Sequence, residues 1–482
     1  MSSPVLERGP LATRRGVLTL VLLCAVQFLD IVDASIVNVA LPSIRADLGF
    51  SQRDLQWVLS GYLLTYGGFL LLGGRAADLM GRRRLLVIGT LVFAACSLLG
   101  GLAGTAGQLV TARMGQGVGA AMMAPAGLSI LTTTFRTGRD RSRALAAWGS
   151  VSGVAAAAGV FLGGVLSQGP GWRWVLFVNV PVCLAIVVAA LLLVEGREPV
   201  RRVSGRTFLS AALVTSAMLL LIFALVRAPD LGWRSAHVLG ELGTAALLFA
   251  AFAVNERRHP DPLFPVAVLR VPGLIAADLT QLIAFAGFVS MFFFLTLYLQ
   301  TGLGYTPIQA GSAYLPITAG IAVAAGLSAR LTARVGTRPI IVSGALIAGT
   351  GMLMLARLPA GGHYLTDLLP GLLIMSVGLG AVFVTVTAAA NAGVPPAQAG
   401  LAAGMLNTAL QLGSALGLAI FSGIATTRTR SLLDRHVGAV DAMTGGLRWA
   451  LVACATSVFV AAVIAARAPN IRTVQPISGG AL

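Results

Sequence analysis

The sequence predicts an all-α membrane protein that crosses the bilayer many times. Of its 482 residues, 57% are hydrophobic and only 11% are charged, and the mean hydropathy is +0.87. A soluble domain has about 25% charged residues, so this chain needs lipid as its solvent. Its apolar residues fall into long runs, and about 20 such residues cross a bilayer as a helix. Backbone polar groups in lipid must be satisfied internally, which makes helices the expected spanning form.

Fourteen apolar runs are candidate spans. They comprise residues 16–41, 54–74, 84–104, 107–133, 144–167, 174–194, 207–226, 236–254, 272–300, 308–330, 339–358, 364–388, 399–427 and 447–467. The first run is too long for a cleaved signal peptide and contains Asp30 and Asp33. The runs at 207–226 and 236–254 could also make fewer crossings.

The distribution of arginine predicts the orientation. All 34 basic residues are Arg. With the N-terminus in the cytoplasm, more than twice as many arginines fall in cytoplasmic connections as in external ones, as the positive-inside rule requires. Both termini are then cytoplasmic. The lack of lysine also excludes a phosphate-binding Gly-Lys-Ser/Thr loop and a Schiff-base cofactor.

Two charged junctions, at 195–206 and 255–262, divide the runs into six, two and six. The predicted organisation is a cytoplasmic N-terminus (1–15), a six-helix bundle (16–194), a linker with two extra transmembrane helices (195–271), a second six-helix bundle (272–467) and a cytoplasmic tail (468–482). Gly336-Thr-Arg338 in the second bundle occupies the place of Gly81-Arg82-Arg83 in the first, which indicates an internal repeat.

Several motifs follow the spans in order. They are Asp33-Ala-Ser-Ile-Val-Asn38-Val-Ala-Leu-Pro42, Gly74-x-x-x-Asp78-x-x-Gly81-Arg82-Arg83, Leu109-x-x-x-Arg113-x-x-Gln116-Gly117 and Gly171-Trp-Arg-Trp174. Together they resemble the fourteen-helix drug:proton antiporter family of the major facilitator superfamily, over nearly the whole chain. The resemblance implies two six-helix bundles plus two central helices. It also implies proton-driven export of small amphipathic compounds or antibiotics by alternating access.

The chain departs from that family at two positions. Val160 stands where the helix 5 motif carries proline, and Leu410 stands where an arginine often precedes the glutamine of helix 13. The lost proline bears on antiport more than on transport itself. A proton-coupled symporter that imports a small nutrient therefore stays the alternative.

Asp33, Asp30 and Arg113 are the candidates for proton coupling. A charge in the bilayer core costs at least ~2.5 kcal/mol, so these side chains should face a cavity or a partner. Asp30 and Asp33 are three residues apart on one helix face, where two carboxylates do not both ionise easily. By helical rise, Arg113 and Asp33 lie roughly 9 Å and roughly 12 Å from the outer ends of their helices. We therefore expect an Asp33–Arg113 ion pair that protonation breaks, and the alternative is a static pair.

The connection between the second and third spans is a candidate conformational latch. Its members are Gly74, Asp78, Gly81, Arg82 and Arg83. The glycines permit a tight turn, and Asp78 could sit at the positive N-terminus of a facing helix. The resemblance implies a latch between the two halves; the alternative is that the arginines only set topology.

Polar and aromatic residues within the spans are candidates for lining a substrate cavity. They are Gln56, Trp57, Tyr62, Gln116, Asp278, Gln281, Asn407 and Gln411. Asp278 could contact a cationic substrate or carry a second proton, or have only a local polar role. The fifth span contains glycines that allow close helix packing or a bend that seals the cavity: Gly149, Gly153, Gly159, Gly163 and Gly164.

The sequence lacks the clustered His/Asp, Cys/His or Ser/His set that a membrane-embedded enzyme would need, so we expect no enzyme. The four cysteines have no metal-ligand spacing, and we expect neither a metal nor another cofactor. The expected partners are a small-molecule substrate, protons and the lipid bilayer, with no nucleic acid. The net charge of +17 follows from membrane topology. A monomer in a bacterial cytoplasmic membrane is the expectation.

Overall fold

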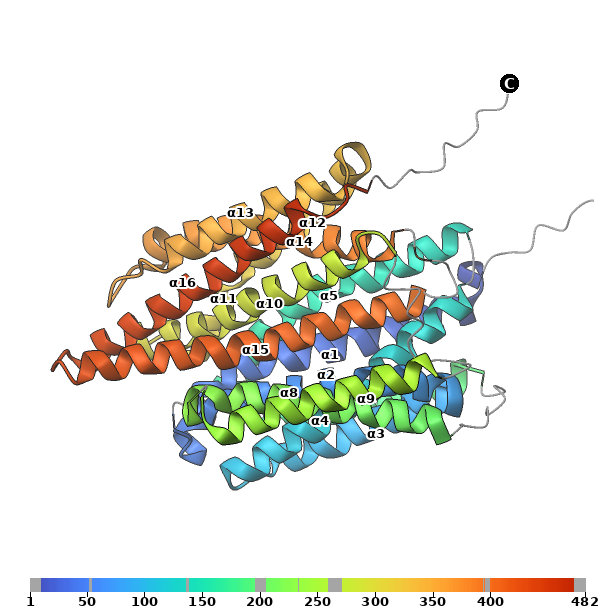
Figure 1. Cartoon of the computed structure of the whole chain (residues 1–482), viewed down its shortest axis with the longest axis horizontal. Helices are drawn as coiled ribbons and strands as arrows, with labels where there is room; N and C mark the ends of the chain where they lie inside the picture. The colour runs from blue at the N-terminus through green and yellow to red at the C-terminus, as the bar shows by residue number, and fades with distance from the viewer. Residues whose placement is uncertain are drawn as a thin grey trace, which may run out of the picture.

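The computed structural model describes residues 10–51, 54–135, 138–195, 205–232, 234–258, 271–392, 394 and 399–471. Every regular element in these ranges is helical, and the long helices run roughly parallel or antiparallel to one another (Figure 1). This agrees with the predicted fold class.

We call α1 to α7 the first half. Its elements are η1 (Pro10–Ala12), α1 (Arg14–Leu48), η2 (Asp54–Gln56), α2 (Trp57–Met80), α3 (Arg82–Gly101), α4 (Ala106–Thr134), α5 (Gly138–Gln168), α6 (Trp174–Phe177) and α7 (Asn179–Leu193). Thr13 caps α1 by accepting a hydrogen bond from the amide of Gly16. Thr105 caps α4 in the same way through the amide of Gln108.

We call α10 to α16 the second half. Its elements are α10 (Leu274–Leu297), η4 (Tyr298–Gly302), α11 (Pro307–Ala313), α12 (Leu315–Val335), α13 (Thr337–Leu355), η5 (Tyr364–Leu368), α14 (Leu369–Asn391), α15 (Ala399–Leu433) and α16 (Ala439–Ala466). The first residues of the predicted tail pack against α13, because the amide of Thr337 donates to the carbonyl of Ile471.

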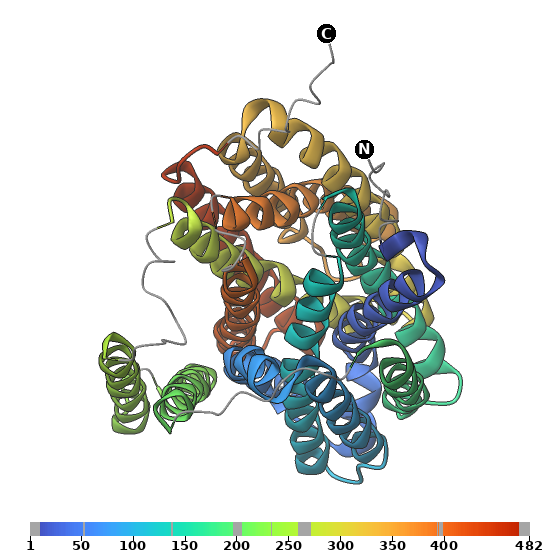
Figure 2. The same ribbon diagram turned by 90° about the vertical axis from the view of Figure 1, so that its right-hand side faces the viewer.

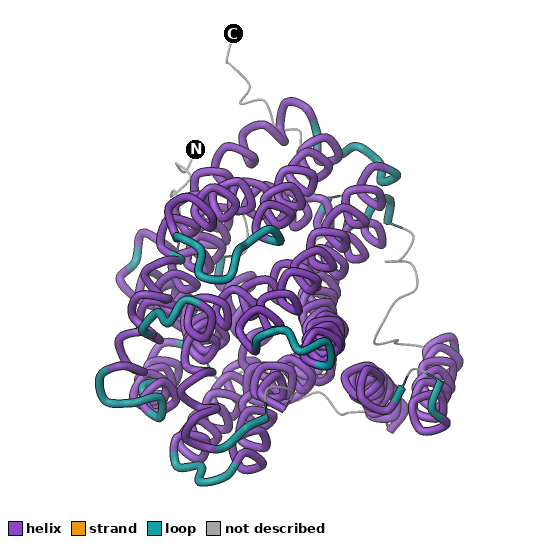
Figure 3. The backbone as a smooth tube through the Cα atoms, turned by 90° about the vertical axis from the view of Figure 1, so that its left-hand side faces the viewer, coloured by secondary structure: helices purple, strands orange, loops and turns teal. Residues whose placement is uncertain are grey.

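The helices α8 (Gly205–Leu231) and α9 (Ala236–Arg257) form a hairpin beside the rest of the bundle (Figures 2 and 3). The helix α8 packs against α2 of the first half and α15 of the second, whereas α9 packs against α8. Several polar contacts join the two helices of the hairpin. The hydroxyl of Ser210 donates to Glu256 over 2.5 Å, and Arg227 pairs with Glu241 over 3.1 Å.

A helix or a consecutive helix pair occupies each of the fourteen predicted runs. Within the described residues, eleven helical segments are long and apolar enough to cross a membrane. The helices α2, α5 and α8 are not among them, although α5 and α8 contain the shorter apolar stretches Ala158–Gln168 and Leu209–Ala224. Fourteen crossings are consistent with this architecture and stay a prediction.

Each half contributes one long helix that packs against the other half. The helix α5 packs against α11 and α12, and α15 packs against α2. The first residues of α1 and the last residues of α16 lie at the same end of the bundle (Figure 1). We call this the terminal end. Near the opposite end, the side-chain amide of Asn38 donates to Thr296 over 3.4 Å. The amide of Gln300 donates to the carbonyl of Val39 over 2.8 Å.

Candidate functional site

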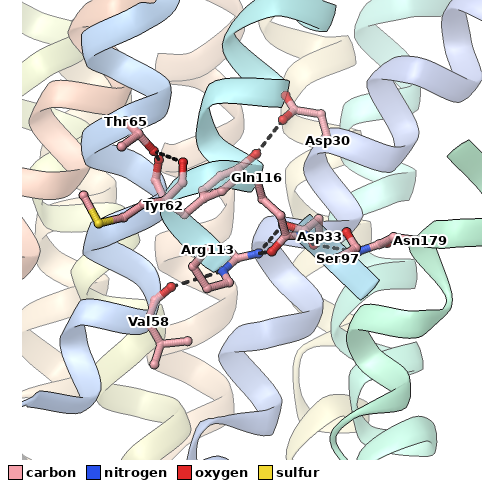
Figure 4. A network of polar contacts seen from close by, with 10 residues as sticks. Asp30, Asp33, Val58, Tyr62, Thr65, Ser97, Arg113, Gln116 and Asn179 are labelled. Carbon is pink, nitrogen blue, oxygen red and sulfur yellow. Dashed lines mark hydrogen bonds and ion pairs between the residues drawn. The ribbon is translucent and has the colours of Figure 1, made fainter. Parts of the chain in front are cut away.

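A buried polar network lies inside the first half, centred on Asp33 of α1 (Figure 4). Oδ2 of Asp33 lies 2.6 Å from Nη1 of Arg113 on α4, and both side chains have 0% exposure. Oδ1 accepts hydrogen bonds from Asn179 of α7 over 2.7 Å and from Gln116 of α4 over 3.1 Å. Three helices thus converge on one carboxylate.

Arg113 is held from several sides. Nη1 also donates to Oε1 of Gln116 over 2.9 Å, and Nε donates to the carbonyl of Val58 over 3.2 Å. The guanidinium lies over the ring of Tyr62, 4.4 Å from the centroid. This cation–π contact is stronger in a desolvated site than at a surface. The planar guanidinium makes these contacts simultaneously, which a lysine ammonium would not do.

The close approach of α2 and α4 brings Tyr62 to this position. At Gly117 of α4, an added Cβ would collide with the carbonyl of Tyr62 and the hydroxyl of Thr65. Glycine therefore permits the helix contact at this level. The hydroxyl of Thr65 donates to the carbonyl of Met114 over 2.7 Å and adds a polar tie between the same helices.

Asp30 lies next to this network and has a different set of partners. Its Oδ1 accepts from the hydroxyl of Tyr62 and its Oδ2 from that of Tyr66, each over 2.8 Å. Asp30 is 8% exposed, whereas Asp33 is fully buried. The two carboxylates thus share one face of α1 but are separately satisfied.

In the Asp33–Arg113 pair, only the acid can lose its charge. Arginine stays protonated in proteins, so a proton can join the acid but not leave the base. A proton on Asp33 would leave Arg113 as an unpaired buried cation, which is strongly destabilising. Nη2 of Arg113 and Oδ1 of Asn179 already have no hydrogen-bond partner within the described residues. The arrangement can therefore respond to protonation by rearranging.

The structure brings Asp33 and Arg113 together, as the matching helix depths led us to expect, and Asp30 lies beside them with its own tyrosine partners. It places two predicted cavity residues differently. Gln116 is fully buried, and it bonds Asp33, Arg113 and Ser97 rather than lining a cavity. Tyr62 is buried between Asp30 and Arg113. Both belong to the charge network.

The other predicted cavity residues lie on helices that face the seam between the halves or the α8–α9 hairpin. Trp57 packs against Phe223 of α8, with ring centroids 6.3 Å apart. Gln411 packs closely against Gly67 of α2: a Cβ added to Gly67 would lie 3.2 Å from the Cβ of Gln411. On α10, Oδ1 of Asp278 and Oε1 of Gln281 are buried and have no partner in the part of the chain that is described.

The predicted latch is mostly helical, which corrects the expectation of a loop that begins at Gly74. Residues 74–80 belong to α2, and α3 begins at Arg82, so Gly81 alone forms the connection. Gly81 has φ 91°, a conformation that side chains disfavour. The side chain of Asp78 lies outside the described residues, and its role as a latch stays a prediction.

Three of the α5 glycines sit at tight contacts. An added Cβ at Gly159 or Gly163 would meet α1, at 2.9 Å from the carbonyl of Val32 or 2.7 Å from that of Ile36. At Gly164 it would meet the carbonyl of Pro307, in the other half, at 2.6 Å. The surroundings of Gly149 and Gly153 lie outside the described residues. Close packing thus accounts for the last three glycines, and sealing stays a hypothesis.

Sequence reasoning missed Asn179, Tyr66 and Ser97 as members of the network. Asn179 offered a signal, because it is a polar residue at the start of an otherwise apolar helix. Tyr66 offered a weaker one, four residues after Tyr62 and therefore on the same helix face. Ser97 had none, since small hydroxyl residues are common in membrane helices.

Comparison with known families gives the identity of the fold. The model of the Major Facilitator Superfamily matches residues 23–418. The chain belongs to this superfamily. It is therefore a multi-pass membrane transporter and not an enzyme.

The relatives of this major facilitator protein include exporters and resistance proteins. It is 40% identical over 424 residues to the puromycin resistance protein pur8 of Streptomyces alboniger, covering 86% of this chain and 83% of the relative. It is 37% identical over 478 residues to the cephamycin export protein CmcT of Amycolatopsis lactamdurans, covering 97% of each. A tetracenomycin C resistance and export protein of Streptomyces glaucescens is 33% identical over 397 residues, covering 82% of this chain and 73% of the relative.

A solved structure shares the fold. The crystal structure of the human organic anion transporter MFSD10 (TETRAN) superposes with a TM-score of 0.64 at 15% identity, covering 94% of this chain and 100% of that one. At this identity the likeness concerns the fold alone.

Proposed function

We propose that this protein exports small amphipathic compounds or antibiotics across a bacterial cytoplasmic membrane, driven by protons that move inward. Its relatives carry names of antibiotic resistance and export, which supports efflux. The observation that carries proton coupling is the fully buried ion pair of Asp33 and Arg113. Ionisable residues inside a membrane are rare and costly, so this buried pair is the candidate functional site.

In this mechanism, Asp33 is charged while its pair with Arg113 is intact. A proton that reaches Asp33 cancels the carboxylate and frees Arg113 to seek other acceptors, of which Gln116 and the Val58 carbonyl are already in place. Asn179 and Gln116 both donate to Oδ1 of Asp33 and so fix the orientation of its carboxylate. Loss of the proton restores the pair and resets the carrier.

The contacts between the halves support alternating access. Near the end opposite the terminal end, Asn38 of α1 bonds Thr296 of α10, and Gln300 of η4 bonds Val39 of α1. At the same end, α5 lies against α11 at Gly164. With the N-terminus in the cytoplasm, this conformation is closed toward the outside. Export then requires these contacts to part. An inward proton gradient supplies about 2.3 kcal/mol per charge per 100 mV from the electrical component alone.

The test uses inside-out vesicles with an acid interior and an internal pH-sensitive dye. Cationic, neutral and anionic amphiphiles are added outside, and we expect some of them to release protons from wild-type vesicles. Asp33→Asn should abolish this release. Asp47→Asn is the matched control, because Asp47 lies on the same helix in an exposed ion pair with Arg173.

Two outcomes would contradict antiport. Proton release that is unchanged in Asp33→Asn would remove Asp33 from the mechanism. If a compound loaded inside the vesicles instead left them together with protons, the protein would be a symporter, which is the alternative function that the Val160 substitution keeps open.

A further inference from the structure

A groove of about 500 Å³ lies between the first turns of α10 and the last turn of α16. It is at the terminal end of the bundle, where α16 ends (Figure 1). Its apolar part is lined by Ile275, Ala276 and Leu279 of α10 and by Ile464 of α16. Arg467 is the one charged residue among the described residues that line it. The groove thus combines apolar walls with a cation at its outer end.

The groove exists because α10 and α16 separate toward the terminal end. At mid-helix they are in direct contact, since a Cβ added to Gly287 would lie 2.6 Å from the carbonyl of Cys454. Roughly 16 Å from there along α10, at 1.5 Å per residue, Ala276 faces the groove. The space between the two helices therefore opens only near the membrane surface.

The rim of the groove is apolar and accessible. Ile275 and Leu279 are each 46% exposed, and Val463 of α16, next to Ile464, is 52% exposed. A contiguous apolar surface of this kind marks a contact with the membrane. The groove is therefore continuous with surface that acyl chains cover.

We propose that this groove binds an anionic phospholipid, with the lipid phosphate at Arg467 and one acyl chain along the apolar walls. The proposal goes beyond export, because it concerns a lipid of the bilayer and not the transported compound. A guanidinium matches the geometry of a phosphate and can make two parallel bonds with it. Basic pockets between membrane helices recognise anionic headgroups in this way.

The charges at the outer end of the groove favour an anion. Arg467 is exposed, and it pairs with no carboxylate within the described residues. No side chain caps the start of α10, and its first turn contains no acid. The amides of Ile275 and Ala276 therefore have no intrahelical partner. The positive end of this helix adds to the charge of Arg467.

Two requirements distinguish an anionic lipid from other ligands. A soluble phosphate would use the positive charge but leave the apolar walls uncovered. A zwitterionic phospholipid would cover the walls but bring its ammonium group close to Arg467, and the two like charges repel each other. An anionic phospholipid meets both requirements.

The chain that follows α16 holds the backbone of Arg467 in place. The side chain of Asn470 donates to the carbonyl of Val335 and accepts from the amide of Arg338, each over 3.1 Å. Arg467 is thus fixed by α16 on one side and by these bonds on the other. Binding then has to order little more than the side chain, which lowers its entropic cost.

The experiment measures which lipid occupies the groove. In the full chain, with Cys24, Cys96, Cys183 and Cys454 replaced by alanine, a bimane fluorophore is attached at Val463→Cys, beside the groove. The protein is placed in phosphatidylcholine nanodiscs. These contain a small and equal fraction of doxyl-labelled phosphatidylglycerol or of doxyl-labelled phosphatidylcholine. The ratio of quenching by the two labelled lipids gives the headgroup selectivity.

We expect phosphatidylglycerol to be selected about tenfold, which is the effect of one hydrogen bond to a charged group. Arg467→Gln removes the charge, and Ala276→Phe fills the groove but keeps the charge. Each variant should abolish the selectivity. Arg334→Gln is the matched control, because Arg334 is an exposed arginine in the last turn of α12 that does not line the groove. It should retain the selectivity.

A second label position tests whether the general surface charge is sufficient. Leu192 of α7 is 74% exposed, and the nearby Arg15 is already paired with Glu195 over 3.4 Å. Bimane at Leu192→Cys should therefore report no selectivity.

Several results would overturn the proposal. They are a wild-type groove without selectivity, equal selectivity at both labels, and selectivity that persists in Arg467→Gln or Ala276→Phe. Displacement of the labelled lipid by inorganic phosphate at constant ionic strength would also do so, since it would indicate a site for a soluble anion. None of these results depends on transport, which the dye assay with Asp33→Asn tests separately.

Discussion

Asp33 and Asp47 lie on the same helix, and each binds an arginine over 2.6 Å, but only one of the two pairs is buried. The Asp33–Arg113 pair has no exposed surface, whereas Arg173 and Asp47 are 39% and 46% exposed. Exposed pairs contribute about 0–1 kcal/mol, while breaking a buried pair costs about 3–5 kcal/mol. The same contact geometry therefore has very different consequences at the two positions.

We predict that Asp33→Asn abolishes proton-coupled transport and lowers thermal stability, while Asp47→Asn does neither to a comparable extent. Asparagine keeps the shape of Asp33 but leaves Arg113 without its counter-ion, at a cost of about 3–5 kcal/mol. Transport in vesicles and the unfolding temperature in detergent check both parts. Equal behaviour of the two variants would contradict the assignment.

We predict that Arg113→Lys loses most of the transport activity although it keeps the charge. Lysine cannot reproduce the simultaneous bonds to Asp33, Gln116 and the Val58 carbonyl or the same stacking on Tyr62. The loss should be at least about tenfold, since bonds to charged groups contribute about 1.5–3 kcal/mol each. Arg173→Lys at the exposed pair is the control and should transport normally.

We predict that Asn179→Ala reduces transport about tenfold. The amide of Asn179 donates to Oδ1 of Asp33 over 2.7 Å, and a hydrogen bond to a charged group contributes about 1.5–3 kcal/mol. The initial rate of proton release from vesicles checks this. A wild-type rate in Asn179→Ala would show that this bond is dispensable.

We predict that Gly164→Ala impairs transport, while Gly240→Ala leaves it unchanged. A methyl group at position 164 would sit 2.6 Å from the carbonyl of Pro307, so α5 and α11 could no longer close against each other. At Gly240 of α9 nothing lies within 4 Å of the added atom. Labelling by a membrane-impermeant thiol reagent at Gln300→Cys should increase in Gly164→Ala, because this end would stay open.

Much of the fold could be predicted from the sequence, because a membrane helix is defined by composition over about 20 residues. Hydropathy located a helix at every predicted run, including the hairpin α8–α9. The helix ends were less predictable. The helix α1 continues to Leu48, well past the apolar run that ends at residue 41, and α5 starts at Gly138. Gly49, in the left-handed conformation, ends α1 by donating to the carbonyl of Arg45, so the cap rather than hydropathy sets this end.

The charged core of the site was predictable because acids and arginines inside a membrane are rare and must pair. Its uncharged members were not. Gln116 was predicted to line a cavity, because the sequence does not indicate which hydrogen-bond partner an uncharged amide has. Tyr66 and Ser97 depend on the rotation of α2 and α3 about their own axes, which apolar sequences define weakly. The tight turn at Gly81 shows the same limit, since the sequence could not tell that α2 continues to Met80.

Polar contacts join the two helices of the α8–α9 hairpin to each other. Ser210 and Glu256 meet near one end and Arg227 and Glu241 near the other, while α8 packs against α2 and α15. A helix pair whose charged side chains meet inside the pair can enter the bilayer as a unit during synthesis. It can wait there while the second half is still being made, and then serve as the surface against which α15 docks.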